Sequence, residues 1–249
     1  MGTQNEIKRM DKETIKHNLF IHHHLGLGDH FDCNGMVRYI QKKWSYDEVS
    51  VFCKDNYYEM VDYMYRDNDK IKVIKIDRHK EYDEVKRILN NQSKNHDHFL
   101  VVGHQYYDHY AKDKNCWEVF YDQVSIPYEV RKSYFYVEKD LEAEEKLFQK
   151  LNPENLPFAF VHDDKDRGFV LDKSHIKNKD LHIIENDTSE NIFHFISILE
   201  KAEEVHCMES SFKTLVDIYC DQEKLFFHDF RGHPLGSQSY KNWKVVKYE

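Results

Sequence analysis

The sequence contains few residues that interrupt regular secondary structure: its 249 residues include only 8 glycines and 4 prolines. Hydrophobic residues make up 40% of the chain and charged residues 33%. These apolar residues can build a sizeable core, so wholesale disorder is not expected. A chain of this length forms one large domain or two small ones. Its composition favours well-defined helices and strands over a loop-rich architecture.

Cysteine is also scarce, and its spacing argues against two kinds of site. An odd number of cysteines without a CxxC pair fits neither a disulfide framework nor a structural zinc site. Reduced, mostly buried thiols fit this pattern better. The five residues are Cys33, Cys53, Cys116, Cys207 and Cys220.

No apolar run approaches the roughly 20 residues that a membrane-spanning helix needs. The first 18 residues are polar and charged, unlike a signal peptide or a membrane anchor. The formal net charge is -9 at pH 7, and lysine and arginine are spread among acidic residues. Such a chain repels the phosphate backbone of nucleic acids. We therefore expect a soluble, cytoplasmic protein that binds no nucleic acid; its oligomeric state is not indicated.

Apolar runs typical of strands alternate with amphipathic segments typical of helices in the first ~105 residues. This alternation predicts a parallel sheet with covering helices, a doubly wound α/β unit. The expected strands span 18–24, 48–54, 70–76 and 98–104, and the expected helices span 29–44, 56–67 and 81–91.

The second half repeats this alternation after an aromatic-rich stretch that Pro127 interrupts. Ser189 is the expected N-cap of the helix at 189–202. We predict two Rossmann-like α/β domains, residues 1–138 and 139–249, that face a cleft. The expected helices of the second half span 140–151, 189–202 and 210–220, and the strands span 157–163, 180–187, 203–209 and 224–230, with a last strand or edge segment in the tail.

The GLGD run at 26–29 lies where the first strand ends and the first helix begins. Gly26 and Gly28 let the backbone approach a ligand closely. The helix start offers N–H groups and a positive dipole end, which suit phosphate or carboxylate. The run is not a complete GxGxxG dinucleotide motif. The alternative is a tight turn in which Asp29 caps the helix.

Open α/β sheets bind ligands at the carboxyl ends of their strands. Three further strand ends in this sequence carry polar residues that could bind an anionic ligand. His162 and Arg167 in FVHDDKDRGF could pair with phosphate or sugar hydroxyls; the alternative is a solvated charged loop. Arg231, in FFHDFRGHP, follows another strand. Together these positions resemble a two-lobed site for an anionic ligand.

The segment VHCMESSFKTLVD at 205–217 contains the third of these strand-to-helix junctions. The hydroxyls of Ser210 and Ser211, with helix-start N–H groups, suit a diphosphate, and Glu209 could accept hydrogen bonds from sugar hydroxyls. The alternative is ordinary helix capping. The nucleophile-elbow pattern GxSxG is missing, which disfavours a serine hydrolase.

The histidines at 22–24 raise the question of a metal site. Neighbours on a strand point to opposite faces, so only His22 and His24 share one. A zinc site needs a third ligand, for which His162 is the candidate. The alternative, which we favour, is strand-end histidines without a metal.

The runs HHLGLGDHFDCNGMVRYI, FVHDDKDRG and VHCMESSFKTLVD, in this order, resemble glycosyltransferase-like proteins of the GT-B fold. The chain is similar to a small set of such proteins from bacterial and large-virus surface-glycan gene neighbourhoods. If the protein is viral, the host-cell cytoplasm is its expected location. More distantly, the chain resembles heptosyltransferases and fucosyltransferase-like enzymes. The likeness covers about residues 18–235.

The resemblance implies an acceptor-binding first domain and a second domain that binds a nucleotide-sugar, with no metal or other cofactor. Asp29 matches the candidate base of heptosyltransferase-like enzymes, and His30 is a second candidate. The activity implied is inverting sugar transfer to a glycan or other hydroxyl acceptor. The resemblance places His162 and the Glu209–Ser210–Ser211 turn on the donor side. The further candidates for binding the donor or its phosphates are Gly26, Gly28, Arg167, Lys213 and Arg231.

Two other interpretations stay open on the sequence. A non-catalytic protein of the same fold could bind sugars or nucleotides, since 17 tyrosines and 16 phenylalanines could provide stacking surfaces. A metal-dependent enzyme would use His22, His24 and His162. The sequence does not identify the donor sugar, the nucleotide or the acceptor.

Overall fold

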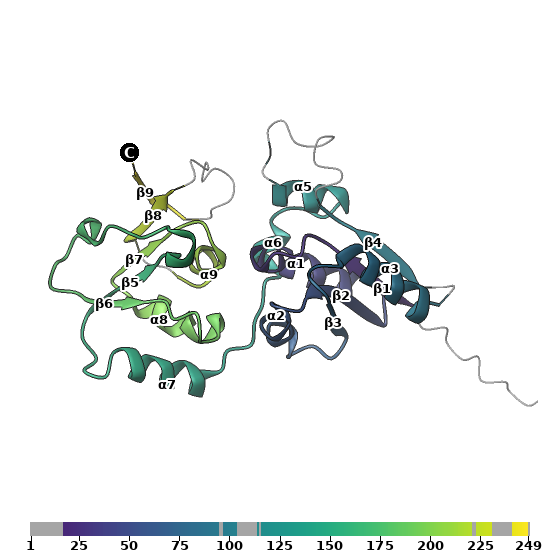
Figure 1. Cartoon of the computed structure of the whole chain (residues 1–249), viewed down its shortest axis with the longest axis horizontal. Helices are drawn as coiled ribbons and strands as arrows, with labels where there is room; N and C mark the ends of the chain where they lie inside the picture. Colours follow the sequence, from purple (N-terminus) through teal and green to yellow (C-terminus); the bar gives the residue numbers. More distant parts are fainter. Residues whose placement is uncertain are drawn as a thin grey trace, which may run out of the picture.

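The computed structural model describes residues 17–94, 97–103, 114, 116–220, 223–230 and 241–248. These residues form two α/β lobes that lie side by side (Figure 1). We call the part up to Ser133 the first lobe and the part from Leu141 the second lobe. The stretch 135–140, which has no helix or strand, connects them.

The first lobe is built on a four-stranded parallel sheet with the order β3-β2-β1-β4. Its helix α1 buries Phe31, Met36, Val37 and Ile40, the residues that recur at helical spacing. The elements are β1 (Asn18–His22), α1 (Leu27–Lys43), β2 (Glu48–Lys54), α2 (Tyr58–Tyr65), β3 (Ile71–Ile76), α3 (Glu81–Gln92), β4 (His98–Val101), α5 (Cys116–Gln123) and α6 (Val130–Ser133).

The second lobe contains a five-stranded parallel sheet with the order β6-β5-β7-β8-β9. Its first helix begins where the Asp140 carboxylate accepts a hydrogen bond from the Ala143 N–H. The elements are α7 (Leu141–Leu151), β5 (Phe158–His162), the 3₁₀ turns η2 (Lys165–Arg167) and η3 (Lys173–His175), β6 (His182–Glu185), the 3₁₀ turn η4 (Ile192–Phe195), α8 (Ile196–Lys201), β7 (Glu204–Cys207), α9 (Ser211–Tyr219), β8 (Leu225–Asp229) and β9 (Lys244–Lys247).

The predicted fold class, two Rossmann-like α/β units, is confirmed. The expected strands and helices are present, and the tail forms the edge strand β9. The predicted domain boundary between residues 138 and 139 falls in the connecting stretch 135–140 and stays a prediction.

Two local predictions were wrong at helix starts. Helix α1 begins at Leu27 rather than at residue 29, because Gly26 is its extended N-cap and Gly28 lies inside the first turn. Ser189 caps no helix; its N–H and hydroxyl bond to the Asp187 carboxylate in a turn. The cap of the following 3₁₀ turn is Asn191, whose side chain accepts from the Phe193 N–H.

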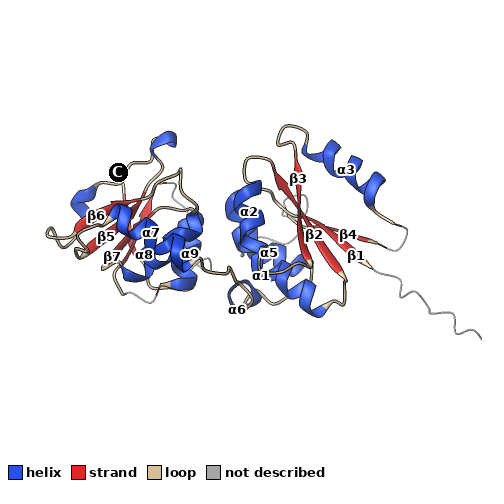
Figure 2. Ribbon diagram, turned by 90° about the horizontal axis from the view of Figure 1, so that it is seen from below, coloured by secondary structure: helices blue, strands red, loops and turns tan. Residues whose placement is uncertain are grey.

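The helices are divided between the two faces of the first sheet. Helices α1 and α2 lie on the face toward the second lobe, and α3 lies on the opposite face (Figures 1 and 2). In the second lobe, α7, α8 and α9 cover the face toward the first lobe (Figure 2). The lobes therefore meet through helices, with α1 packed against α9.

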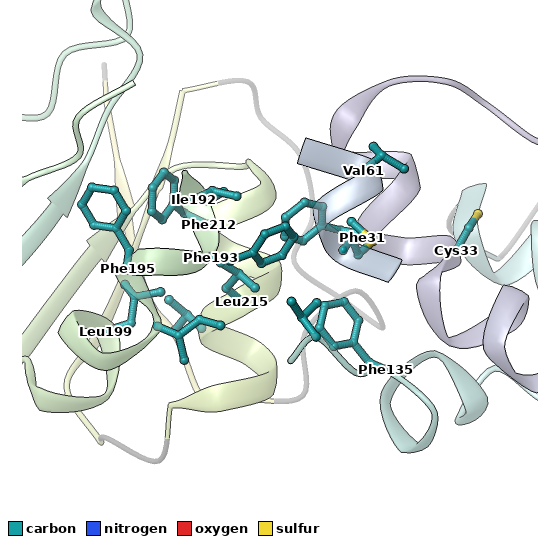
Figure 3. Close-up of a cluster of buried hydrophobic side chains, with 14 of the residues drawn as sticks. Phe31, Cys33, Val61, Phe135, Ile192, Phe193, Phe195, Leu199, Phe212 and Leu215 are labelled. Carbon is teal, nitrogen blue, oxygen red and sulfur yellow. The ribbon is translucent and has the colours of Figure 1, made fainter. Parts of the chain in front are cut away.

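The contact between the lobes is apolar and rich in aromatic rings. Phe193 of η4 is 1% exposed and stacks on Phe31 of α1, with ring centroids 5.1 Å apart. Phe193 also stacks on Tyr63 of α2, with ring centroids 5.6 Å apart. Phe135 and Leu215 belong to the same buried cluster (Figure 3). A single hydrophobic core thus runs through both lobes and fixes their relative position.

No helix in the described ranges combines the length and apolar character that crossing a membrane would require.

Replacing Phe193 by alanine should lower the free energy of unfolding by about 3–5 kcal/mol, because a large buried ring and its two stacking contacts are lost. Chemical denaturation measures this change. Leu141→Ala is the control, because Leu141 is 68% exposed; it should change stability by less than about 0.5 kcal/mol. An equally small effect of Phe193→Ala would show that this ring does not hold the lobes together.

Candidate active site

Each sheet has one point at which the strand order reverses, where successive strands switch from one side of the first strand to the other. In open α/β sheets, ligands bind at such a point, next to the carboxyl ends of the parallel strands. In the first sheet the reversal lies between β1 and β4, and in the second it lies between β5 and β7. The segments that leave β1, β5 and β7 carry the site residues predicted around residues 26–30, 162–167 and 209–213.

The Asp29 carboxylate lies in the first turn of α1 and is held by three neighbours. Its Oδ1 accepts a hydrogen bond from Trp117 Nε1 at 3.1 Å. Its Oδ2 lies 3.8 Å from His24 Nδ1. The same oxygen would lie 2.6 Å from a Cβ on Gly26. Glycine at position 26 therefore makes room for the carboxylate, whose side chain stays 19% exposed.

The start of α1 lies next to the start of α9 from the other lobe. A Cβ on Gly28 would be 4.0 Å from Ser211 Oγ, an ordinary van der Waals separation. The structure thus brings the predicted Gly26–Asp29 and Glu209–Ser211 segments together. The N-termini of both helices, each with unpaired amides and a positive dipole end, therefore lie close together.

Acidic groups from both lobes lie close enough at this junction to influence one another. Burial raises the pKa of Asp32 to about 6, and Asp29 and Glu209 add to this effect although Arg131 opposes it. Asp32 and Arg131 form a buried ion pair, with Arg131 Nε donating to Oδ1 at 2.6 Å. This pair ties α1 to α6 beneath the site.

The second lobe contributes buried polar atoms without a hydrogen-bond partner in the described part of the chain. They are His162 Nδ1, Asp163 Oδ2 and Glu209 Oε2, all at the carboxyl ends of β5 and β7. Burial lowers the pKa of His162 to about 4, and its ring lies 4.5 Å from that of Phe212. Buried polar groups in folded proteins are almost always bonded. These atoms are therefore suited to a ligand with hydroxyl or amide groups.

Ser210 and Ser211 lie at the start of α9, but two of the three predicted cations are already paired. Ser210 is the N-cap of α9, but its hydroxyl donates to the Met208 carbonyl and accepts no capping bond from a helix N–H. Lys213 is 2% exposed and bonds to Asp217 at 3.1 Å. Arg167 is exposed and bound to Asp164. Arg231 lies outside the described residues.

His30, the second predicted catalytic residue, lies beneath the site. It is fully buried, and neither ring nitrogen has a hydrogen-bond partner among the described residues. Its ring contacts that of His23 at 4.6 Å. Burial lowers the pKa of His30 well below its usual range. A group in this position cannot touch an acceptor unless the site rearranges, so Asp29 is the better-placed candidate.

A cavity of about 400 Å³ lies in the first lobe, and two of its lining residues, His24 and Gly26, lie beside Asp29. The Glu81 carboxylate is its polar centre: Oε1 bonds to His22 Nε2 at 2.9 Å and Oε2 to Lys54 Nζ at 3.0 Å. Burial opposes ionisation of Glu81, but these two partners outweigh it and lower its pKa. The lining residues are His22, His23, His24, Leu25, Gly26, Lys54, Glu81, Tyr82, Val101 and Val102.

The predicted alternative of a metal site gains no support from the described ranges, where no three histidine, cysteine or acidic side chains are grouped to hold a metal. His22 bonds to Glu81, whereas His24 lies beside Asp29. His162 belongs to the other lobe.

Sequence reasoning missed four residues of the site: Trp117, Lys54, Glu81 and Tyr82. Lys54 ends β2, and Glu81 and Tyr82 begin α3, so the rule that ligands gather at strand ends could have found them. Trp117 lies 88 residues from Asp29 along the chain. No local pattern predicts that contact.

Comparison with solved structures identifies the architecture. A glycosyltransferase of family 9 from Veillonella parvula DSM 2008 superposes with a TM-score of 0.58 at 10% identity, over 94% of this chain and 88% of that one. The E. coli heptosyltransferase WaaC with ADP gives 0.50 at 11% identity, over 94% and 93%. The chain has the GT-B fold. No protein-family model and no curated protein sequence matches it.

The two glycines of the GLGD run should respond differently to a methyl group. Gly26→Ala should displace the Asp29 carboxylate and shift the NMR signal of the Trp117 indole N–H, because its Cβ would meet Asp29 Oδ2. Gly28→Ala is the control: its Cβ has room, and alanine favours a helix by up to about 1 kcal/mol. That variant should leave the indole signal in place. Equal shifts in both variants would contradict the geometry.

The neutral His162 should make the fold sensitive to acid. Its pKa is about 4 in the folded chain against 6.5 in the unfolded chain, so the unfolded chain takes up the proton first as the pH falls. The stabilisation is complete above pH 6.5 and disappears toward pH 4. Between pH 7 and pH 5, wild type should lose about 1–2 kcal/mol more unfolding free energy than His162→Gln. Urea titrations that give equal losses for both proteins would exclude this assignment.

Proposed function

We propose that the protein is a glycosyltransferase that moves a sugar from a nucleotide-sugar to a hydroxyl group of a glycan or another acceptor. Metal ions and other cofactors play no part in this proposal, and the anomeric configuration inverts. One observation carries it: the N-termini of α1 and α9, from different lobes, meet beside the Asp29 carboxylate. The GT-B fold supports the same activity class.

The helix starts would bind the diphosphate of the donor. Lys213 and Arg167 are each engaged by an aspartate, so backbone amides of α1 and α9 would supply most of the positive potential. Two helix N-termini that converge on one point favour an anion there. The same amides would stabilise the charge that develops on the departing diphosphate.

The second lobe would bind the donor, because its buried polar atoms without a hydrogen-bond partner among the described residues are suited to the donor's hydroxyl groups. Glu209 Oε2 can accept from a sugar hydroxyl, and His162 Nδ1 can bond to a hydroxyl or an amide. Ser211 lies at the first turn of α9, where its hydroxyl can reach a phosphate oxygen. A structural neighbour of the same fold, the E. coli heptosyltransferase, was solved with ADP, which supports a nucleoside diphosphate as the leaving group.

Asp29 would act as the general base. Its carboxylate takes the proton of the acceptor hydroxyl as that oxygen forms a bond to the anomeric carbon. The bond between the anomeric carbon and the diphosphate oxygen breaks, and its electron pair leaves with the diphosphate. Attack from the side opposite the leaving group inverts the anomeric carbon. Trp117 orients the base by donating to Oδ1.

Asp29→Asn should reduce sugar transfer by about 10²–10⁴-fold, since the amide cannot take the proton. Nucleotide binding should be nearly unchanged, because the helix amides remain. Transfer is followed by release of nucleoside diphosphate from UDP-, GDP-, ADP- and CMP-linked sugars, with nucleoside monophosphate measured for the CMP donor. Asp180→Asn, at an exposed turn, is the matched control and should retain full activity. Turnover unaffected in Asp29→Asn would remove Asp29 as the base.

The same assay separates the enzyme from a non-catalytic binding protein of this fold. A binding protein would bind a nucleotide-sugar and raise the melting temperature by mass action without releasing nucleotide. The partly exposed carboxylate of Asp29 next to residues of the cavity favours the enzyme, because a binding site alone does not require a base there.

A further inference from the structure

We infer that the cavity beside Asp29 binds an uncharged, hydroxyl-rich sugar ring of the acceptor. This inference rests on the proposed function, because it gives the acceptor its chemical class. The cavity, of about 400 Å³, is large enough for a monosaccharide and lies at the strand-order reversal of the first sheet.

The charges of the cavity favour an uncharged ligand. The formal charges of Lys54 and Glu81 cancel within an ion pair of 3.0 Å. Burial lowers the pKa of His23 to about 4, so this lining residue is neutral at pH 7. A carboxylate or phosphate on the ligand would have to compete with the Glu81 carboxylate for the Lys54 ammonium. Its own negative charge would then lie close to the negative charge of Glu81.

The hydrogen-bonding groups match hydroxyls, which both donate and accept. Each oxygen of Glu81 accepts one bond, from His22 or Lys54, and a carboxylate offers about four lone-pair sites. Glu81 can therefore accept from two further hydroxyls. The Lys54 ammonium has three N–H donors, of which Glu81 takes one, so it can donate to a hydroxyl oxygen.

An aromatic ring at the mouth of the cavity gives a sugar an apolar surface to stack on. Tyr82 lines the cavity, yet 73% of it is exposed, the largest exposed fraction among the exposed large hydrophobic residues in the described ranges. Its ring meets that of His22 nearly at a right angle, with centroids 5.8 Å apart. A pyranose ring stacked on Tyr82 would occupy the cavity that Glu81 and Lys54 also line.

The cavity also leads to the base. His24 and Gly26 form part of its lining, and both lie against the Asp29 carboxylate. A ring in the cavity would therefore lie next to two residues that border the Asp29 carboxylate. The cavity selects the acceptor and Asp29 activates it.

Two probes that differ at a single substituent of the ring, and thereby in charge, test this inference. Methyl β-glucopyranoside and methyl β-glucuronide share a ring and differ in having a hydroxymethyl or a carboxylate group. Calorimetric or NMR titration should show the glucuronide binding about tenfold more weakly to wild type. Tyr82→Ala should weaken glucoside binding about three- to tenfold. Tyr136→Ala, an exposed tyrosine outside the cavity, should not change it.

Glu81→Gln should reverse the preference, because Lys54 then keeps an uncompensated charge and attracts the glucuronide. This reversal distinguishes a recognition role from a structural one. Equal or tighter glucuronide binding to wild type would overturn the inference. So would the absence of glucoside binding, or glucoside binding that Tyr82→Ala leaves unchanged.

A parallel assay of nucleotide release separates this inference from the proposed function. If nucleotide-sugars are turned over but the glucoside does not bind, only the acceptor class is wrong. If the glucoside binds but nucleotide-sugars neither bind nor release nucleotide, the acceptor cavity stands as a sugar site and the transferase function fails.

Discussion

The stacking of Phe193 between Phe31 and Tyr63 is the contact on which the site depends. It belongs to one hydrophobic core that continues from the first lobe into the second. Because packed aromatic surfaces have few alternative arrangements, this contact sets the distance between α1 and α9. Their N-termini then meet at Gly28 and Ser211. A site made of groups from two lobes exists only while that core holds them in register.

Most charged side chains near the junction of α1 and α9 are paired with a neighbour of opposite charge, which favours binding of an anion by the helix N-termini. The buried Asp32–Arg131 pair and the buried Lys213–Asp217 pair neutralise their own members, and the histidines beneath the site are neutral. Among the described residues, the helix amides are then the positive groups that remain at the junction, where the carboxylates of Asp29 and Glu209 also lie. The cavity at β1 and β4 adds a hydrogen-bonding surface, and its lining includes His24 and Gly26, which lie beside Asp29. For an attack opposite the leaving group, the acceptor oxygen would lie between Asp29 and the anomeric carbon, with the diphosphate on the far side of that carbon.

The sequence predicts the two α/β units well, because their strands are apolar runs and their helices have a single apolar face. It also predicts that Asp29 and Ser211 follow strand ends. It could not predict Trp117 on Asp29, since that contact joins residues far apart in the chain. Nor could it show that Lys213 turns to Asp217 one helical turn away, or that His30 faces His23 in the core. The direction of a side chain is decided by packing, which hydrophobic spacing does not encode.

The central claim is that helix starts from two lobes bind one diphosphate. Calorimetric titration of ADP, UDP and GDP into wild type and Ser211→Asp tests it most directly, because an acidic residue in the first turn is compatible with a helix while it repels a phosphate there. The account predicts that one nucleotide binds to wild type and binds at least about tenfold more weakly to Ser211→Asp, about 1.4 kcal/mol. Equal affinity for both proteins, or no binding of any nucleotide to wild type, would contradict it.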